Sequence, residues 1–177
     1  VDVLNKKFYE ELADWYFYAQ TECEFPVRPE KKRTDDELKR FRERHTAESL
    51  IRLITRMMFV WFLKAKDLVP EQLFDKDTLD KFLKYNDKNE SNYYKAVLQN
   101  LFFATLNTPM KKDAEKEGKQ SRIFIGEAKK SGKKSEGYLQ QQYYRYKSLM
   151  SDPDGLVNYF EHIPFLNGGL FESLDVQ

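Results

Sequence analysis

The run Met57–Leu63 contains no polar side chain; it reads Met-Met-Phe-Val-Trp-Phe-Leu. It lies inside the longest helical pattern of the chain, residues 35–66, in which apolar side chains recur every three or four positions. A helix that is apolar on every side is normally buried within protein. We therefore predict that this segment is the central helix and that its aromatic residues belong to the core: Phe59, Trp61 and Phe62.

Helical spacing also predicts helices over residues 2–23 and 93–106, a short helix from about residue 76 and a last one around 156–160. Thr34 and Glu37 have the spacing of a capping box, which would begin the central helix. Fourteen Phe and eleven Tyr outnumber seven Gly, a balance that favours packed helices over a turn-rich β architecture. The predicted fold is mainly α, a multi-helix bundle forming a single domain over residues 1–177.

Residues 110–137 have a different character, because Lys, Glu, Gly and Ser dominate them. Between Lys111 and Lys147 there are eleven Lys and Arg against five Asp and Glu, a net charge of +6. The whole chain carries +1, so the remainder carries about 1 − 6 = −5. We expect 110–137 to be a long, flexible, basic insertion with one short strand, Ile123–Ile125, or a hairpin.

Positive charge in and after this insertion is mixed with tyrosines, which suits phosphate contacts combined with base or sugar stacking. The alternative is a solvated loop followed by tyrosines that pack on the helices. The arginines of the central helix are expected on its surface: Arg40, Arg42, Arg44, Arg52 and Arg56. The candidate DNA contacts are Lys111, Lys112, Lys119, Arg122, Lys129, Lys130, Lys133, Lys134, Arg145 and Lys147.

Glu127 and Lys129 follow the predicted strand in the way that metal-dependent nucleases present a carboxylate and a lysine to the scissile phosphate. Only Asp113 or Glu115 lies nearby as an upstream acid, and the pair arises readily by chance in a segment rich in both residue types. With isolated histidines and a single cysteine, Cys23, a zinc site is not expected. We predict no catalytic residue and no metal ligand in this chain.

No segment reaches the ~18 apolar residues of a membrane-spanning helix, and no signal peptide is visible. A single cysteine fits a reducing compartment, so the expected location is cytoplasmic, with no membrane partner. The chain begins at Val1 and stops soon after an Asn-Gly-Gly turn at residues 167–169. We expect it to be a module of a larger protein.

Four blocks carry a family resemblance. The blocks are Phe8–Tyr16, Ile51–Lys64, Tyr93–Asn107 and Ile163–Glu172. Through them the chain resembles the segment upstream of the methylase domain in large bacterial type IIG, Eco57I-like restriction-modification enzymes of the adenine-specific DNA methyltransferase family. The resemblance covers nearly the whole chain apart from the basic insertion.

The resemblance implies a helical connector between a nuclease module and a methyltransferase that uses S-adenosylmethionine. The family's catalytic signature, Asn-Pro-Pro-Tyr/Phe, is absent from this sequence, so no catalytic residue carries over. The fragment is expected to be no enzyme and to hold no cofactor, whereas its parent would be an adenine methyltransferase and endonuclease needing S-adenosylmethionine and a divalent metal. Its expected partners are the DNA backbone and the neighbouring nuclease and methylase domains. The remaining alternatives are a nuclease fragment built on Glu127 and Lys129, and a helical protein-protein interaction module without DNA contact.

Overall fold

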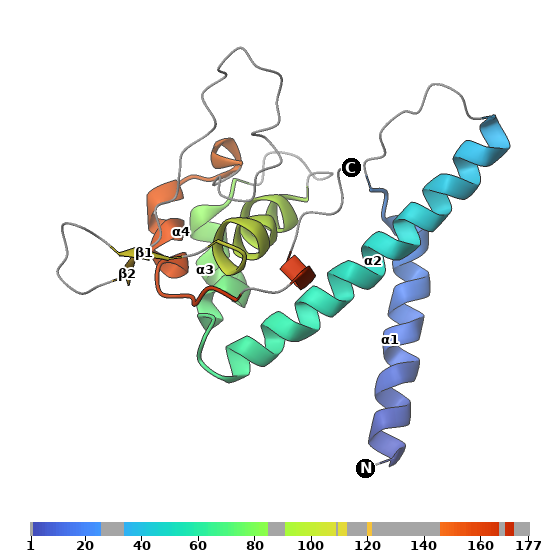
Figure 1. Cartoon of the computed structure of the whole chain (residues 1–177), viewed down its shortest axis with the longest axis horizontal. Helices are drawn as coiled ribbons and strands as arrows, with labels where there is room; N and C mark the ends of the chain where they lie inside the picture. Colours follow the sequence, from blue (N-terminus) through green and yellow to red (C-terminus); the bar gives the residue numbers. More distant parts are fainter. Residues whose placement is uncertain are drawn as a thin grey trace. The chain divides into compact units, whose positions relative to one another are not determined.

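The computed structural model describes residues 2–25, 34–84, 91–108, 110–112, 120–121, 146–166 and 169–171. The chain is mainly α-helical, as predicted (Figure 1). It divides into two compact units, the first formed by Val1–Met58 with residues 175–177 and the second by Phe59–Leu174. We call these unit 1 and unit 2 and describe each by itself. The expectation of a single domain stays a prediction.

Helix α1 (Asp2–Glu22) belongs to unit 1 and has nearly the predicted bounds. Its polar side carries ion pairs one turn apart, Lys6 with Glu10 at 3.8 Å and Lys7 with Glu11 at 3.7 Å. Exposed pairs of this kind stabilise a helix by a few tenths of a kcal/mol. Several large side chains of α1 are exposed, namely Phe8, Tyr9, Trp15, Phe17 and Tyr18.

Helix α2 (Asp35–Ala65) is one continuous helix that begins with the predicted capping box. The Thr34 backbone N–H donates to Glu37 Oε2 at 2.9 Å, and the Glu37 N–H donates to Thr34 Oγ1 at 3.4 Å. The reciprocal bonds satisfy donors that have no partner within the first turn. Three acidic residues follow in that turn, where the helix dipole favours negative charge: Asp35, Asp36 and Glu37.

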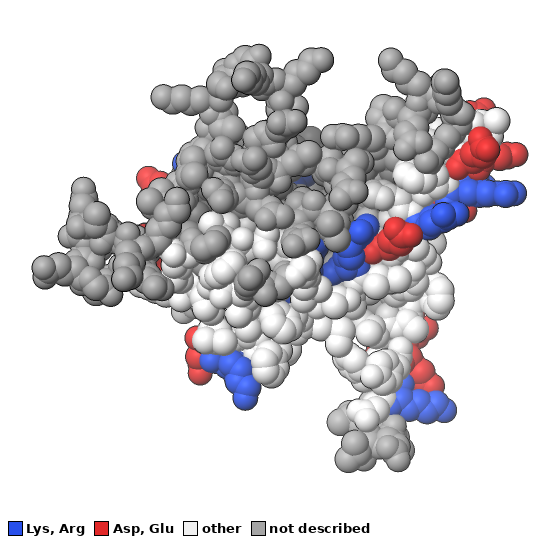
Figure 2. All heavy atoms as spheres, in the orientation of Figure 1, with Lys and Arg blue, Asp and Glu red and all other residues white. Residues whose placement is uncertain are grey.

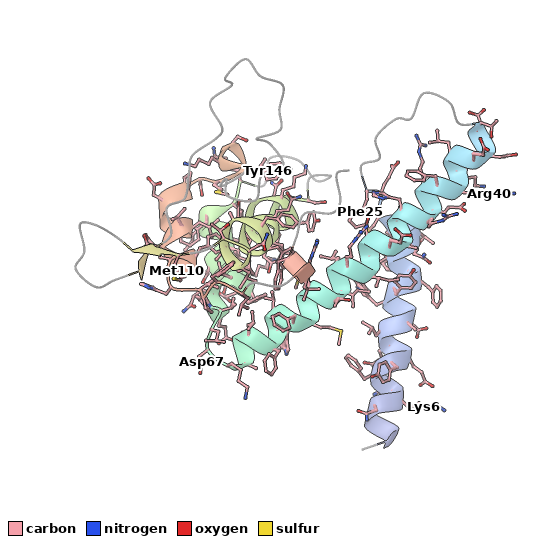
Figure 3. All side chains as sticks on the ribbon, in the orientation of Figure 1. Lys6, Phe25, Arg40, Asp67, Met110 and Tyr146 are labelled. Carbon is pink, nitrogen blue, oxygen red and sulfur yellow. The ribbon has the colours of Figure 1, made fainter. Side chains whose placement is uncertain are left out.

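The end of α2 is a Schellman motif, which lies at the Asp67 label in Figure 3. The Leu68 N–H donates to the Leu63 carbonyl at 3.0 Å, and the Asp67 N–H donates to the Lys64 carbonyl at 3.0 Å. Asp67 has φ of 56°, the left-handed conformation that stops the helix. The chain therefore turns away from the helix axis immediately before Val69 and Pro70.

Unit 2 continues with short helices that capping residues delimit. They are η1 (Glu71–Phe74, a 3₁₀ turn), α3 (Lys76–Phe82) and α4 (Pro153–Phe160). Asp75 caps α3, because its carboxylate accepts from the Thr78 N–H at 2.9 Å. Asp152 caps α4 in the same way, through the Gly155 N–H at 2.9 Å, and the helix starts at Pro153.

The centre of unit 2 is a helical segment made of η2 (Tyr93–Leu98) and η3 (Asn100–Leu106). Both are π-helical, so that N–H groups bond to carbonyls five residues earlier; the Asn107 N–H, for example, donates to the Phe102 carbonyl at 3.2 Å. Every residue from Asn100 to Leu106 is buried, which confirms the predicted position of this segment in the middle of the helices. The other fully buried side chains of unit 2 include Leu73, Met150, Leu156, Phe160, Ile163 and Phe171.

The described part of the insertion contains two short strands, β1 (Lys111–Lys112) and β2 (Gln120–Ser121). They pair antiparallel, with Lys111 opposite Ser121 and Lys112 opposite Gln120. The predicted strand at Ile123–Ile125 and most of the insertion 110–137 lie outside the described residues. The chain is described again from Tyr146, followed by η5 (Lys147–Leu149) and, after α4, by η6 (Gly169–Phe171).

Two sequence predictions about α2 are wrong. The first placed its aromatic residues in the core, whereas the side chains of Phe59, Trp61 and Phe62 are 37%, 60% and 53% exposed. Val60 and Leu63 are the buried members of the apolar run, so one side of this helix end packs inward and the other does not. The second placed all five arginines on the surface, but Arg56 is buried, whereas the three that lie further towards the N-terminus are exposed as predicted: Arg40, Arg42 and Arg44.

No described helix combines the length and the apolar character needed to cross a lipid bilayer. Charged side chains instead gather over the N-terminal half of α2, as Figure 2 shows, while uncharged atoms cover its C-terminal half. This contrast along one helix marks the C-terminal half as a different kind of surface.

Candidate interaction surface

Most of the predicted DNA contacts lie outside the described residues: Lys119, Arg122, Lys129, Lys130, Lys133, Lys134 and Arg145. The same holds for Glu127 of the nuclease alternative. Strand β1 consists of Lys111 and Lys112, and Lys147 lies in η5, shortly after the insertion. DNA binding through these residues therefore stays a prediction.

The described residues do show how unit 2 holds both ends of the insertion. Upstream, the chain leaves η3 at Thr108, which is buried and whose hydroxyl donates to the Phe103 carbonyl at 3.0 Å. Met110 and Tyr146, labelled in Figure 3, lie where the chain leaves and rejoins the described helices.

Downstream, the returning segment is bonded to the end of α3. The Lys84 N–H donates to the Leu149 carbonyl at 2.9 Å, and the Ser151 N–H donates to the Phe82 carbonyl at 2.8 Å. Met150, between these bonds, is buried. The insertion thus leaves and re-enters one compact unit, and its host segments are fixed on both sides.

A group of exposed apolar side chains lies at the C-terminal end of α2 and in the turn that follows. We call it the α2 patch, and it consists of Phe59, Trp61, Phe62 and Leu68. Successive helical residues differ by about 100° around the axis, so Phe59, Phe62 and Trp61 cover adjoining sectors of one side of the helix. All four belong to unit 2.

Trp61 is held in place on one side although it is largely exposed. Its ring meets the Phe74 ring edge-on, with centroids 6.4 Å apart and planes inclined by 74°. The Lys64 Nζ lies 4.4 Å from the centre of the Trp61 ring and donates to Glu71 Oε1 at 2.9 Å. A cation over an indole face and an edge-to-face aromatic pair are both attractive.

Phe59 connects the α2 patch to the core. Its ring centroid is 6.3 Å from that of Phe62 and 5.8 Å from that of Phe171, and Phe171 is buried. Phe171 in turn lies 5.9 Å from Phe102 of η3. Phe59, and Phe62 through it, is therefore connected to buried aromatic rings of the core.

Two hollows flank Lys64, with volumes of about 470 and 360 Å³. Lys64, Glu71 and Gln72 line both, Asp75 and Thr78 line the larger, and His162 lines the smaller. Charged and polar groups dominate their walls, and the Lys64–Glu71 pair is already formed between them. Within the part of the chain that the structure describes, no three His, Cys, Asp or Glu side chains are placed to hold a metal ion.

The pKa values of two titratable groups in unit 2, Asp75 and Tyr93, differ from their ordinary values. Hydrogen bonds from the Thr78 hydroxyl and N–H stabilise the Asp75 carboxylate and lower its pKa. Burial raises the pKa of Tyr93 to about 12, and its hydroxyl donates to the Leu73 carbonyl at 3.0 Å. Both groups hold the local structure, Asp75 as the cap of α3 and Tyr93 as a link between η2 and η1.

Sequence reasoning missed the α2 patch because a continuous apolar run has two structural meanings. Such a helix is either buried by its own fold on all sides, or buried on one side and left apolar on the other. Only the elements that pack against each side of the helix distinguish these two cases, and a single sequence does not reveal that packing.

Among curated proteins, the chain is similar to a protein of Methanocaldococcus jannaschii described as a "putative type II restriction enzyme and methyltransferase". The two sequences are 30% identical over 128 residues, which make up 70% of this chain but only 7% of the relative. No protein-family pattern matches the chain, and no solved structure matches it. The chain is therefore related, over a small part of that protein's length, to a protein of restriction-modification kind.

Proposed function

We propose that this chain is the helical connector of a restriction-modification protein, placed between an endonuclease and an adenine methyltransferase. The observation that carries the proposal is the match of most of this chain to a small part of a much longer restriction enzyme and methyltransferase. Its mainly helical fold is the fold expected of such a connector. S-adenosylmethionine and a divalent metal belong to the neighbouring modules in this proposal, since the methylase signature is absent from the sequence.

In the same proposal the basic insertion contacts the DNA backbone without reading the sequence. The segment Lys111–Lys147, which contains most of the insertion, carries a net charge of +6, the local excess of positive charge in the chain. Positive side chains on phosphates release counterions, so the binding is expected to be weak, sequence-independent and steeply salt-dependent. The described segments on either side of the insertion are hydrogen-bonded within unit 2, which supports a role as a loop that extends from a stable base.

Fluorescence anisotropy on a short duplex, between about 50 and 200 mM salt, tests the DNA contact. Changing Lys129, Lys130, Lys133 and Lys134 to Ala should weaken binding and reduce the salt slope by up to about 0.9 for each phosphate that a replaced lysine had neutralised. The matched control removes four exposed lysines outside the insertion: Lys6, Lys7, Lys39 and Lys76. Equal weakening in both variants would show a general charge effect and would contradict binding through the insertion.

The connector assignment is tested by the longer gene product. It should contain a Gly-rich S-adenosylmethionine motif and the Asn-Pro-Pro-Tyr/Phe signature beyond this chain. Calorimetry on the isolated chain should detect no stoichiometric site for S-adenosylmethionine. Divalent-metal-dependent DNA cleavage by the isolated chain, abolished on changing Glu127 or Lys129, would favour the nuclease alternative instead.

A helical protein-protein interaction module is the second candidate, and the exposed α2 patch favours it. It differs from the connector that touches DNA in one respect, because it needs no DNA affinity. If adding the chain leaves the anisotropy of the duplex unchanged at about 50 mM salt, where phosphate contacts are strong, the result would favour this candidate.

A further inference from the structure

We propose that the last turn of η3, residues 103–108, is a register switch at the base of the insertion. In one register the turn is π-helical, as in the structure, and in the other it is α-helical. The switch belongs to the fold itself and does not depend on whether the insertion binds DNA. Its support comes from the hydrogen bonds of the turn, from a buried hydroxyl without a partner, and from the apolar packing of η3.

Two hydrogen bonds at the end of η3 span five residues. The Asn107 N–H donates to the Phe102 carbonyl at 3.2 Å, and the Thr108 hydroxyl donates to the Phe103 carbonyl at 3.0 Å. In an α-helix the Asn107 N–H bonds instead to the Phe103 carbonyl, four residues earlier. The Thr108 hydroxyl thus bonds to the acceptor that the α register uses, and it stabilises the wider, π-helical turn.

Thr105 lacks a bond that the α register would supply. Its hydroxyl oxygen is buried and has no hydrogen-bond partner, a situation that costs free energy. A threonine inside an α-helix can donate to the carbonyl four residues earlier, as Thr55 of α2 does to Ile51 at 2.8 Å. The corresponding acceptor for Thr105 is the Leu101 carbonyl. The α register therefore gives Thr105 a bond and removes that of Thr108, so the number of these bonds is the same in both registers.

The packing of η3 permits a change confined to its last turn. Every residue from Asn100 to Leu106 is buried, and none of them is charged. One residue of register corresponds to about 100° of rotation and 1.5 Å of rise, so the rotation exchanges apolar contacts and brings no charge into the core. The Asn100 side chain donates to the Ala96 carbonyl at 2.7 Å and holds the start of η3. Packed cores of this kind move between discrete arrangements and do not deform continuously.

Two segments are attached to the turn. On one side Thr108 leads into β1, which pairs with β2 in the insertion. On the other side the Leu166 N–H donates to the Leu106 carbonyl at 2.8 Å. A change of register therefore changes the direction in which the insertion leaves unit 2 and shifts the segment around Leu166. A ligand of the insertion that prefers one direction would change the populations of the two registers.

Nuclear magnetic relaxation dispersion of backbone amides tests the switch, because helix register shifts occur in microseconds to milliseconds. In the whole 177-residue chain, the amides of residues 103–108 should show exchange with a minor state. The amides of Lys111 and Leu166 should exchange at the same rate, since one event moves all of them. Exchange at a different rate at either position would overturn the coupling between the insertion and the segment around Leu166.

Two threonine variants should change the minor population in opposite directions. Thr108→Val removes a bond of the π register and should raise that population about fivefold, the effect of one ordinary hydrogen bond. Thr105→Val removes a bond of the α register and should lower it about fivefold. Thr108→Ser keeps the hydroxyl and Thr55→Val changes only α2, so both controls should leave the exchange near that of the parent.

The opposite signs separate a switch from simple loosening of the core. If both valine variants raise the exchange, the threonines only stabilise one structure and the proposal is wrong. Flat dispersion at residues 103–108 in both the parent and Thr108→Val would also overturn it, because that variant should make the α register most visible. A minor state seen only in Thr108→Val, and restored to the parent level by Thr108→Ser, would support it.

Discussion

Trp61 and Phe102 are both large aromatic residues in helices of unit 2, but only Phe102 is fully buried. The Phe102 ring lies 6.2 Å from that of Phe103 and 5.9 Å from that of Phe171. Phe102→Ala should therefore lower the free energy of unfolding by about 3–5 kcal/mol through reduced burial and a cavity. Trp61→Ala should cost only about 1 kcal/mol, for its interactions with Phe74 and Lys64. Urea denaturation of both variants measures the difference, and similar destabilisation would contradict the exposed position of Trp61.

Tyr93 leads to a prediction at high pH. Its pKa is raised from 10.0 to about 12 by burial, so the folded state binds the phenol proton more tightly than the unfolded state. The resulting stabilisation is fully present below pH 10 and disappears as the pH rises from 10 towards 12. The comparison is with Tyr93→Phe, which removes this phenol alone. The stability advantage of the parent over this variant should shrink across that pH window, and a constant difference would show that Tyr93 is not buried.

At the scale of the element, the first turn of α4 is tightly packed around Gly155. A Cβ atom on Gly155 would meet the Asp152 carboxylate, which caps the helix, and would lie 2.8 Å from Phe82 Cε1 of α3. Gly155→Ala should therefore displace the cap or the ring and destabilise the protein by about 1–2 kcal/mol. Gly169→Ala is the control, since a Cβ there meets nothing within 4 Å. Thermal unfolding should separate the two, and equal midpoints would contradict the close packing of α3 and α4.

The elements were predictable where local chemistry decides them. The spacing of Thr34 and Glu37 predicted the start of α2, and the apolar stripe over residues 93–106 predicted the buried η2 and η3. The side of a helix that stays exposed was not predictable, because periodicity identifies apolar side chains but not what covers them. For the same reason, nothing in the local pattern indicated that Arg56 would be buried while Phe62 would not. The candidate DNA contacts lie mostly beyond the described residues, and they remain predictions.

For the whole molecule, the insertion should be removable without loss of the fold. Replacing residues 111–145 with a Gly-Ser linker of about ten residues shortens the loop and changes its closure free energy by about 1 kcal/mol. The bonds from Lys84 to Leu149 and from Ser151 to Phe82 lie outside the replaced segment and should persist. Circular dichroism and urea denaturation should therefore show a folded protein within about 1 kcal/mol of the parent. Loss of cooperative unfolding would show that unit 2 depends on the insertion for its core.

The anchored ends of the insertion also bear on how a protein of this kind can diversify. The upstream flank is held by the Thr108–Phe103 bond and the downstream flank by the Lys84–Leu149 and Ser151–Phe82 bonds. A segment between such flanks can lengthen, shorten or change its charge with little effect on the folding of its host. Selection on mutations there acts on what the loop binds, whereas selection on mutations in η3 acts first on whether the chain folds at all. The binding properties of the loop and the stability of the scaffold can therefore evolve separately. Grafting loops of different charge between residues 110 and 146 would be a direct route to adjusting its affinity.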